Sequence, residues 1–183
     1  MLKKEMSKTE VEKELEGKGD FVKIDYLTRF LKESLSFDMK KFAYLKLAEI
    51  YERRCMENDA AKVYGFISNL SIPFTDKIKF HLKEAEMYIK AGMFDGADEA
   101  MKKALGNANA SQKAEITFSL KDFYKRQALV YEKEKRRNQA VKIYEKLATM
   151  NITETEREEI KNKLLEMYEK LGKIKEYMML KGK

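Results

Sequence analysis

Apolar residues recur every three or four positions along most of this chain, which is the spacing of one face of an α-helix. In the stretch 21–35 the apolar positions are Phe21, Ile24, Leu27, Phe30, Leu31 and Leu35. Glycines and short polar clusters interrupt the pattern between such stretches. The pattern predicts an all-α protein of about ten helices, joined in pairs as five helical hairpins.

Capping and turn residues predict where these helices begin and end. The expected caps are Thr9 (in a capping box with Glu12), Asp38, Thr75, Thr153 (in a box with Glu156) and, in left-handed conformation at a helix end, Gly92. The expected helices after a thinly apolar first segment lie at about 21–35, 38–55, 58–70, 76–91, 94–105, 110–136, 138–150, 153–171 and from 174 onward.

A pattern centred on a tyrosine occurs four times. The tyrosines are Tyr51, Tyr88, Tyr131 and Tyr168, separated by 37, 43 and 37 residues. Three residues earlier stand Ala48, Ala85, Ala128 and Leu165, and nine residues later stand Ala60, Ala97, Ala140 and Tyr177. Seven residues earlier stand Tyr44, His81, Tyr124 and Lys161, and thirteen later stand Tyr64, Met101, Tyr144 and Lys181. Because small side chains let two helices approach closely, each copy predicts a tightly packed hairpin.

The small and aromatic positions of Asp38 to Gly172 resemble the tetratricopeptide repeat (TPR), whose first helix carries a small residue and an aromatic, and whose second helix repeats that pair. Ala48, Tyr51, Ala60 and Tyr64 match this order. The chain departs from the 34-residue family period, and Pro73 is its one counterpart of the closing proline, so the wider TPR-like superfamily is the better description.

The resemblance implies a right-handed α-α superhelix, a TPR-like solenoid of about five hairpins in a single domain that covers 1–183. Residues 1–37 form a degenerate N-terminal hairpin. The repeats are expected at 38–73, 74–109, 110–152 and 153–183, the last of them incomplete.

Composition narrows the class of protein. Charged residues make up 38% of the 183 residues, with 38 basic and 31 acidic side chains that are interleaved and give a net charge of +7. The single cysteine, Cys55, excludes an internal disulfide, and the single histidine, His81, leaves little material for a metal site. Neither a secretory signal nor the roughly 18 apolar residues of a membrane span is found, so we expect a cytoplasmic protein with no membrane partner.

No catalytic constellation is visible. The sequence contains no phosphate-binding glycine loop, and no serine or cysteine stands at a motif spacing from His81, which falls on the packing stripe of its helix. Many carboxylates precede a basic residue by four positions, as in Glu86 and Lys90, which stabilises a helix. We therefore expect a protein that is not an enzyme and that has no cofactor or metal.

One regularity, a stripe of basic residues, is not explained by core packing. Its members stand five residues before and two residues after each tyrosine: Lys46, Lys83, Arg126 and Lys163, and Arg53, Lys90, Lys133 and Lys170. Two interpretations remain open. The stripe is either the solvated side of each first helix, partly neutralised by glutamates, or an anion-attracting groove, because first helices line the concave surface in proteins that this chain resembles.

The leading hypothesis is a non-catalytic scaffold that binds an acidic or extended peptide of another protein in this groove. The predicted groove residues are Leu45, Lys46, Arg53, Lys83, Lys90, Arg126, Lys133, Lys163 and Lys170. RNA binding by the same groove is the alternative, and the incomplete C-terminal hairpin suggests a homodimer as a further one. A heat-shock tail clamp is disfavoured, since the family's clamp asparagine is replaced by Glu49, Glu86, Leu129 and Glu166.

Overall fold

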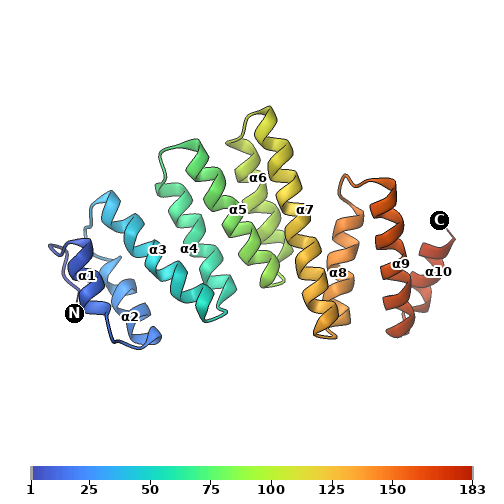
Figure 1. Ribbon diagram of the computed structural model, residues 1–183, viewed down its shortest axis with the longest axis horizontal. Helices are drawn as coiled ribbons and strands as arrows, with labels where there is room; N and C mark the ends of the chain where they lie inside the picture. Colours follow the sequence, from blue (N-terminus) through green and yellow to red (C-terminus); the bar gives the residue numbers. More distant parts are fainter. Residues whose placement is uncertain (1, 183) are drawn as a thin grey trace. The chain divides into compact units, whose positions relative to one another are not determined.

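A computed structural model describes residues 2–182, and these residues form ten α-helices and no strand (Figure 1). The all-α prediction is confirmed. The helices are α1 Lys8–Leu15, α2 Asp20–Phe30, α3 Phe37–Arg53, α4 Glu57–Leu70, α5 Phe74–Lys90, α6 Phe94–Gly106, α7 Ala110–Lys133, α8 Arg137–Ala148, α9 Glu154–Lys170 and α10 Ile174–Lys181.

The chain forms two compact units, Met1–Ile116 and Thr117–Lys183. Unit 1 contains α1 to α6 with the first turns of α7, and unit 2 contains the rest of α7 with α8, α9 and α10. Within unit 1 consecutive helices from α2 to α6 pack against one another, and within unit 2 α9 packs against both α8 and α10. The single solenoid domain stays a prediction.

The four hairpin turns have the same backbone conformation. The residue four positions after each tyrosine is left-handed: Cys55 (φ 52°), Gly92 (φ 73°), Lys135 (φ 59°) and Gly172 (φ 67°). The next residue donates its N–H to the tyrosine carbonyl at 2.8–2.9 Å in all four turns. These bonds form a Schellman motif, which ends the first helix and turns the chain back along it. The left-handed Gly92 was predicted, and the same conformation at Cys55 and Lys135 was not.

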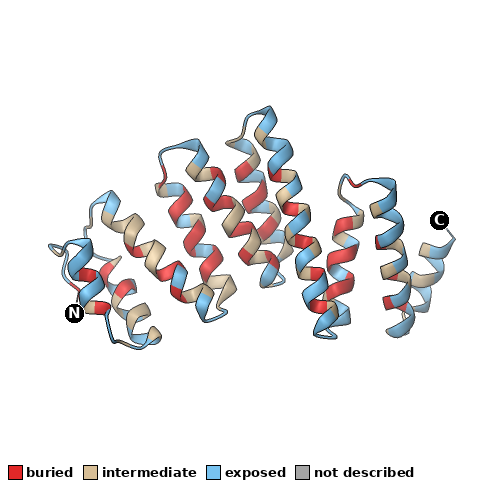
Figure 2. Cartoon of the chain, in the orientation of Figure 1, coloured by how far each residue is buried: buried red, intermediate tan, exposed pale blue. Residues whose placement is uncertain are grey.

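The small positions of the first three copies are buried. Ala48, Ala60, Ala85, Ala97, Ala128 and Ala140 are all 0% exposed (Figure 2). In the last copy Leu165 and Tyr177 are partly exposed, so the pattern weakens in the structure where it weakens in the sequence. In unit 1, Ala48 and Ala60 join one apolar core with Val11, Leu27, Phe30, Ile67 and Met87.

Several predicted helix ends were wrong by one to five residues. The first capping box is made by Ser7 and Glu10, whereas Thr9 lies inside α1. Ser36, and not Asp38, caps α3, because its hydroxyl accepts the Met39 N–H at 3.3 Å. The other corrections are Pro73 in place of Thr75 at the start of α5, and Phe30 in place of Leu35 at the end of α2.

The long helix α7 begins at Ala110, as predicted. Asn109 and Gln112 form a reciprocal cap there: the Gln112 N–H donates to Asn109 Oδ1 at 2.9 Å, and the Asn109 N–H donates to Gln112 Oε1 at 3.0 Å. The capping box of Thr153 and Glu156 at the start of α9 is confirmed. Short polar side chains therefore determine where both helices start.

Candidate partner-binding surface

A pocket of about 460 Å³ lies within unit 2, between the first helices α7 and α9 and above the second helix α8. Its floor is apolar, because Tyr144, Leu147 and Ile160 are buried. Leu129 lines it from α7 and is 59% exposed. The remaining lining residues are polar: Lys125, Glu159, Asn162, Lys163 and Glu166.

The sequence explains why this pocket has an apolar edge. Leu129 directly follows the small residue of its copy, where the other three copies carry Glu49, Glu86 and Glu166. Its exposed branched side chain therefore offers contact area to an apolar group that enters the pocket. A solvent-exposed leucine beside a buried apolar floor is a typical feature of a side-chain binding site.

Ion pairs join the helices around this pocket. Lys163 Nζ on α9 lies 2.7 Å from Glu132 Oε2 on α7, and the hydroxyl of Tyr144 on α8 donates to the other oxygen of the same carboxylate. Burial and this bond raise the pKa of Tyr144 far above its usual value, so its hydroxyl stays protonated and acts as a donor. One carboxylate thus connects three helices and holds the walls of the pocket.

Glu156 plays a similar part near the middle of α7. Its carboxylate lies 2.5 Å from Lys125 Nζ and 3.4 Å from Lys121 Nζ, and it also accepts the backbone N–H of Thr153 at 2.8 Å. The hydrogen bonds from Lys125 and Thr153 lower the pKa of Glu156 to about 2. The carboxylate is therefore ionised at neutral pH and fixes α9 against α7.

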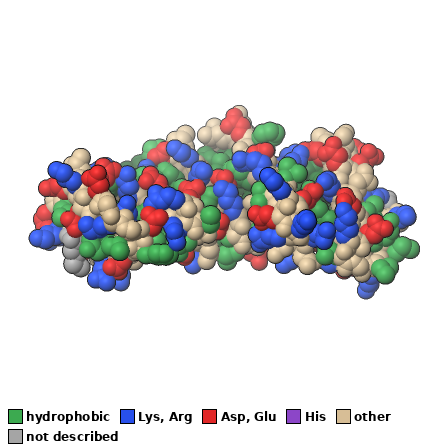
Figure 3. Space-filling view, turned by 60° about the horizontal axis from the view of Figure 1, so that its bottom comes forward, with side chains coloured by type: hydrophobic (Ala, Val, Ile, Leu, Met, Phe, Trp, Pro, Cys, Tyr) green, Lys and Arg blue, Asp and Glu red, His purple; other side chains and the backbone are tan. Residues whose placement is uncertain are grey.

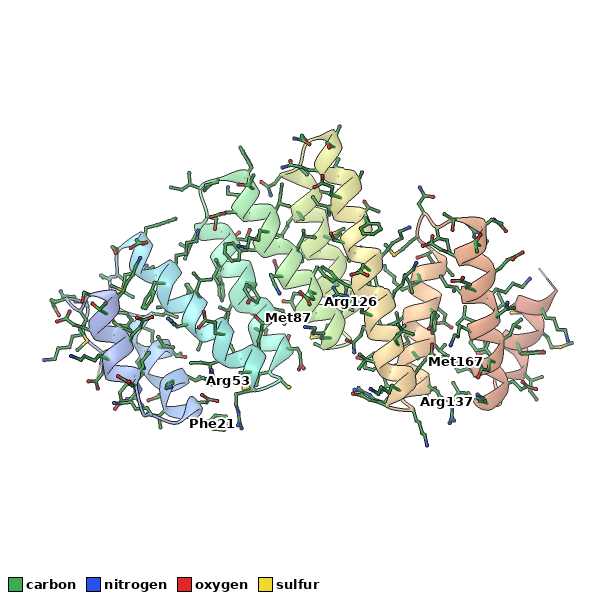
Figure 4. All side chains as sticks on the ribbon, viewed as in Figure 1. Phe21, Arg53, Met87, Arg126, Arg137 and Met167 are labelled. Carbon is green, nitrogen blue, oxygen red and sulfur yellow. The ribbon has the colours of Figure 1, made fainter. Side chains whose placement is uncertain are left out.

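In unit 1 the basic stripe is neutralised by carboxylates. Lys46 lies 2.7 Å from Glu12 and Arg53 lies 2.5 Å from Asp20 (Figure 4). Lys83 and Lys90 both contact Glu86, at 3.1 and 3.2 Å. Leu45 is partly buried and packs against the core of the unit. These contacts agree with the interpretation of the stripe as a solvated helix face.

In unit 2 the stripe is also largely paired. Arg126 lies 3.0 Å from Asp122, Lys170 lies 2.5 Å from Glu166, and Lys163 pairs with Glu132. Lys133 is exposed and has no carboxylate within 4 Å in the described part of the chain. Charges of both signs are accordingly intermingled over the surface in Figure 3.

The structure brings only part of the predicted groove together. Lys46 and Arg53 line a pocket of about 610 Å³ between α1 and α3 in unit 1, and Lys163 lines the pocket of unit 2. Sequence reasoning missed the contribution of α1 to the first pocket, through Glu12 and Lys13, and the apolar floor of the second. The apolar Leu129 among glutamates was the available signal for the latter.

His81 and Cys55 do not form a reactive site with each other. His81 is buried in α5, and its Nδ1 lies 2.8 Å from Glu84 Oε2, which is also buried. Cys55 is exposed in the α3–α4 turn. Residues 2–182 contain no cluster of three histidine, cysteine or acidic side chains that could hold a metal ion, and none of their helices is long and apolar enough to cross a membrane.

No similarity to a known protein indicates a function for this surface. No family model matches the sequence, and no curated protein or solved structure matches it either.

Proposed function

We propose that this chain is a non-catalytic adaptor of the TPR-like class, and that it binds an extended segment of another protein on the surface of its first helices. The pocket of unit 2 carries this proposal, because Leu129 stands exposed above a buried apolar floor. In this proposal the hairpins stack as a right-handed solenoid and the segment lies across α7 and α9.

The lining of the pocket describes the segment it fits. An apolar side chain of the partner would enter between Leu129 and Ile160, and polar groups beside it would meet Lys125, Glu159 and Asn162. The volume suits one or two large apolar side chains, since small-ligand pockets start at about 300 Å³. The mixed charges of the rim suit an amphipathic segment, and the paired lysines argue against a partner chosen by acidity alone.

A selection experiment tests the proposal. A random peptide library is selected against the wild-type protein, and the enriched peptides are then titrated by calorimetry into the Leu129→Glu and Val130→Glu variants. Val130 is the matched control, because it is exposed on the same helix and does not line the pocket. We expect Leu129→Glu to weaken binding by tenfold or more, about 1.4 kcal/mol.

Val130→Glu is expected to bind the enriched peptides as the wild type does. Equal loss in both variants, or no loss in either, would place the peptides elsewhere and contradict the pocket as the binding site. Circular dichroism of both variants checks that their helix content is unchanged.

A further inference from the structure

The positive charge of this protein is concentrated in unit 2. Residues 117–183 contain 17 basic and 11 acidic residues, a net charge of +6, whereas residues 1–116 contain 21 and 20, a net charge of +1. Unit 2 is the smaller unit, so its charge density is much higher. In Figure 3 blue side chains gather right of centre, over the region of α7 and α8. A charge excess of this kind creates a local positive potential.

Much of this charge lies in one hairpin turn. The turn cluster consists of Lys133, Lys135, Arg136 and Arg137, which end α7 and begin α8, and all four are exposed. Lys133, Lys135 and Arg137 have no carboxylate within 4 Å among the described residues, whereas Arg136 lies 3.3 Å from Glu134. The first turn of α8 contains no acidic residue. The cluster is therefore not neutralised locally.

The turn that follows in unit 2 adds to the same surface. Lys173 directly precedes α10, and Lys175 lies in the first turn of that helix. Because α9 packs against α8 and runs back along it, the two turns lie at the same end of their hairpins. The Glu166 carboxylate near the end of α9 lies 2.5 Å from Lys170 Nζ. Lys170 lowers the pKa of Glu166 most, and Arg137 at the start of α8, labelled in Figure 4, lowers it further.

The corresponding turns of unit 1 differ. Arg53 is paired with Asp20, and the guanidinium of Arg54 lies 4.8 Å from the centre of the Phe21 ring. In the turn after α5, Lys90 is paired with Glu86 and no further basic residue follows before α6. Among the residues that the structure describes, the basic side chains at these turns of unit 1 are therefore paired with a carboxylate or packed on an aromatic ring, whereas most of those in unit 2 have no carboxylate nearby.

We propose that the two hairpin turns of unit 2 bind the phosphate backbone of single-stranded RNA. The surface is cationic, so affinity would come from the release of counterions, which nucleic acids condense strongly. The rings of Tyr131 and Tyr168 are buried beneath Arg136 and Lys173, so bases would not stack on them. Binding should accordingly tolerate any sequence, and it uses a surface separate from the proposed peptide pocket.

A single strand fits better than a duplex. Adjacent packed helices lie about 8–10 Å apart, so the two turns are separated by roughly the width of a helix pair. A flexible strand can bring successive phosphates to both turns, whereas a rigid duplex presents them at fixed positions.

Fluorescence anisotropy tests this inference with a labelled single-stranded RNA of mixed sequence and the full-length protein. We expect Lys133→Glu/Lys135→Glu/Arg137→Glu to weaken binding by tenfold or more. In wild type, the logarithm of the binding constant should fall with the logarithm of salt concentration with a slope of about −2, which corresponds to three phosphates. The matched control Lys79→Glu/Lys102→Glu/Lys103→Glu, on exposed residues of unit 1, changes the net charge equally and should lose less than threefold.

Three results would overturn the proposal: no RNA binding by wild type, equal losses in the two triple variants, or polyglutamate binding more tightly than RNA. The milder Lys133→Ala/Arg137→Ala variant repeats the test if the triple variant does not fold. It should still weaken RNA binding by several-fold and reduce the salt dependence.

Discussion

The hydroxyl of Tyr64 on α4 donates a hydrogen bond to the carboxylate of Glu52 on α3, and so ties the second helix of the hairpin to the first. Tyr144 and Glu132 repeat this bond in unit 2, at the same positions of their hairpin. In the hairpin of α5 and α6 the two positions are Met101 and Ile89, which are both buried. At these two positions, a hairpin therefore carries either a hydrogen-bonded tyrosine and glutamate or two buried apolar side chains.

Removal of one partner should destabilise the hairpin. We predict that Tyr64→Phe lowers the free energy of unfolding by about 1–3 kcal/mol, because the partly buried Glu52 carboxylate loses a charged hydrogen bond. Urea denaturation followed by circular dichroism measures the change.

The double variant Tyr64→Met/Glu52→Ile, which copies Met101 and Ile89, should be closer to wild type than Tyr64→Met alone. A double-mutant cycle gives the coupling between the two positions. Additive losses would show that the two side chains act independently and would contradict this prediction.

The left-handed turn residues make a second prediction. Cys55 adopts a φ of 52°, which is strained for any residue with a Cβ, so Cys55→Gly should stabilise the protein by up to about 1 kcal/mol. At Gly172, which also has a left-handed φ, an added Cβ would meet no neighbouring atom within 4 Å. Gly172→Ala should therefore destabilise the protein through backbone strain alone, by about 1 kcal/mol. Thermal unfolding of the two variants should shift the melting temperature in opposite directions.

The periodicity of the apolar residues made the helices predictable. Their ends were less predictable, because neighbouring polar residues compete for the capping position. The tyrosine-centred pattern identified four of the five hairpins, because a stripe of buried residues must recur with the helical period. At the start of α1 and α3, however, a serine lies two residues before the predicted cap, and each serine hydroxyl forms the capping bond. Sequence alone does not rank two neighbouring caps of similar strength.

The candidate site was less predictable than the fold. The basic stripe follows from spacing, but the carboxylates that pair with Lys46 and Arg53 come from Glu12 and Asp20, far away in the chain. Such pairs depend on how α1 and α2 dock against α3, which no local pattern records. The apolar floor of the pocket in unit 2 likewise comes from two separate helices, α8 and α9.

A third prediction concerns Gly65 in the middle of α4. A Cβ at this position would lie 2.9 Å from the carboxylate of Glu84, which is buried and held by His81. Although alanine favours helices by about 1 kcal/mol over glycine, Gly65→Ala should therefore destabilise the protein, by about 1–3 kcal/mol.

Chemical denaturation measures this change. The control is Gly106→Ala at the end of α6, where nothing lies within 4 Å of the added Cβ, so that variant should be neutral or slightly stabilising. Stabilisation by Gly65→Ala would mean that Glu84 moves away without cost.

The last prediction is a pH dependence that runs through Glu156. Its pKa is about 2 in the folded protein, below the value of about 4.3 of an unfolded glutamate. A lowered pKa means that the stabilisation is fully present above about pH 4.3 and is lost as the pH falls toward 2. The melting temperature of wild type should therefore decrease more steeply on acidification than that of Glu156→Gln, which cannot titrate.

At neutral pH the Glu156→Gln variant should be less stable than wild type by about 1 kcal/mol, because it loses the ion pairs with Lys121 and Lys125. The difference between the two proteins should shrink below about pH 4, since protonated Glu156 loses the same pairs. Glu158→Gln, at an exposed position of the same helix, is the control and should follow the wild-type acid limb. Parallel acid limbs of wild type and Glu156→Gln would show that Glu156 does not link α9 to α7 in the way that its contacts indicate.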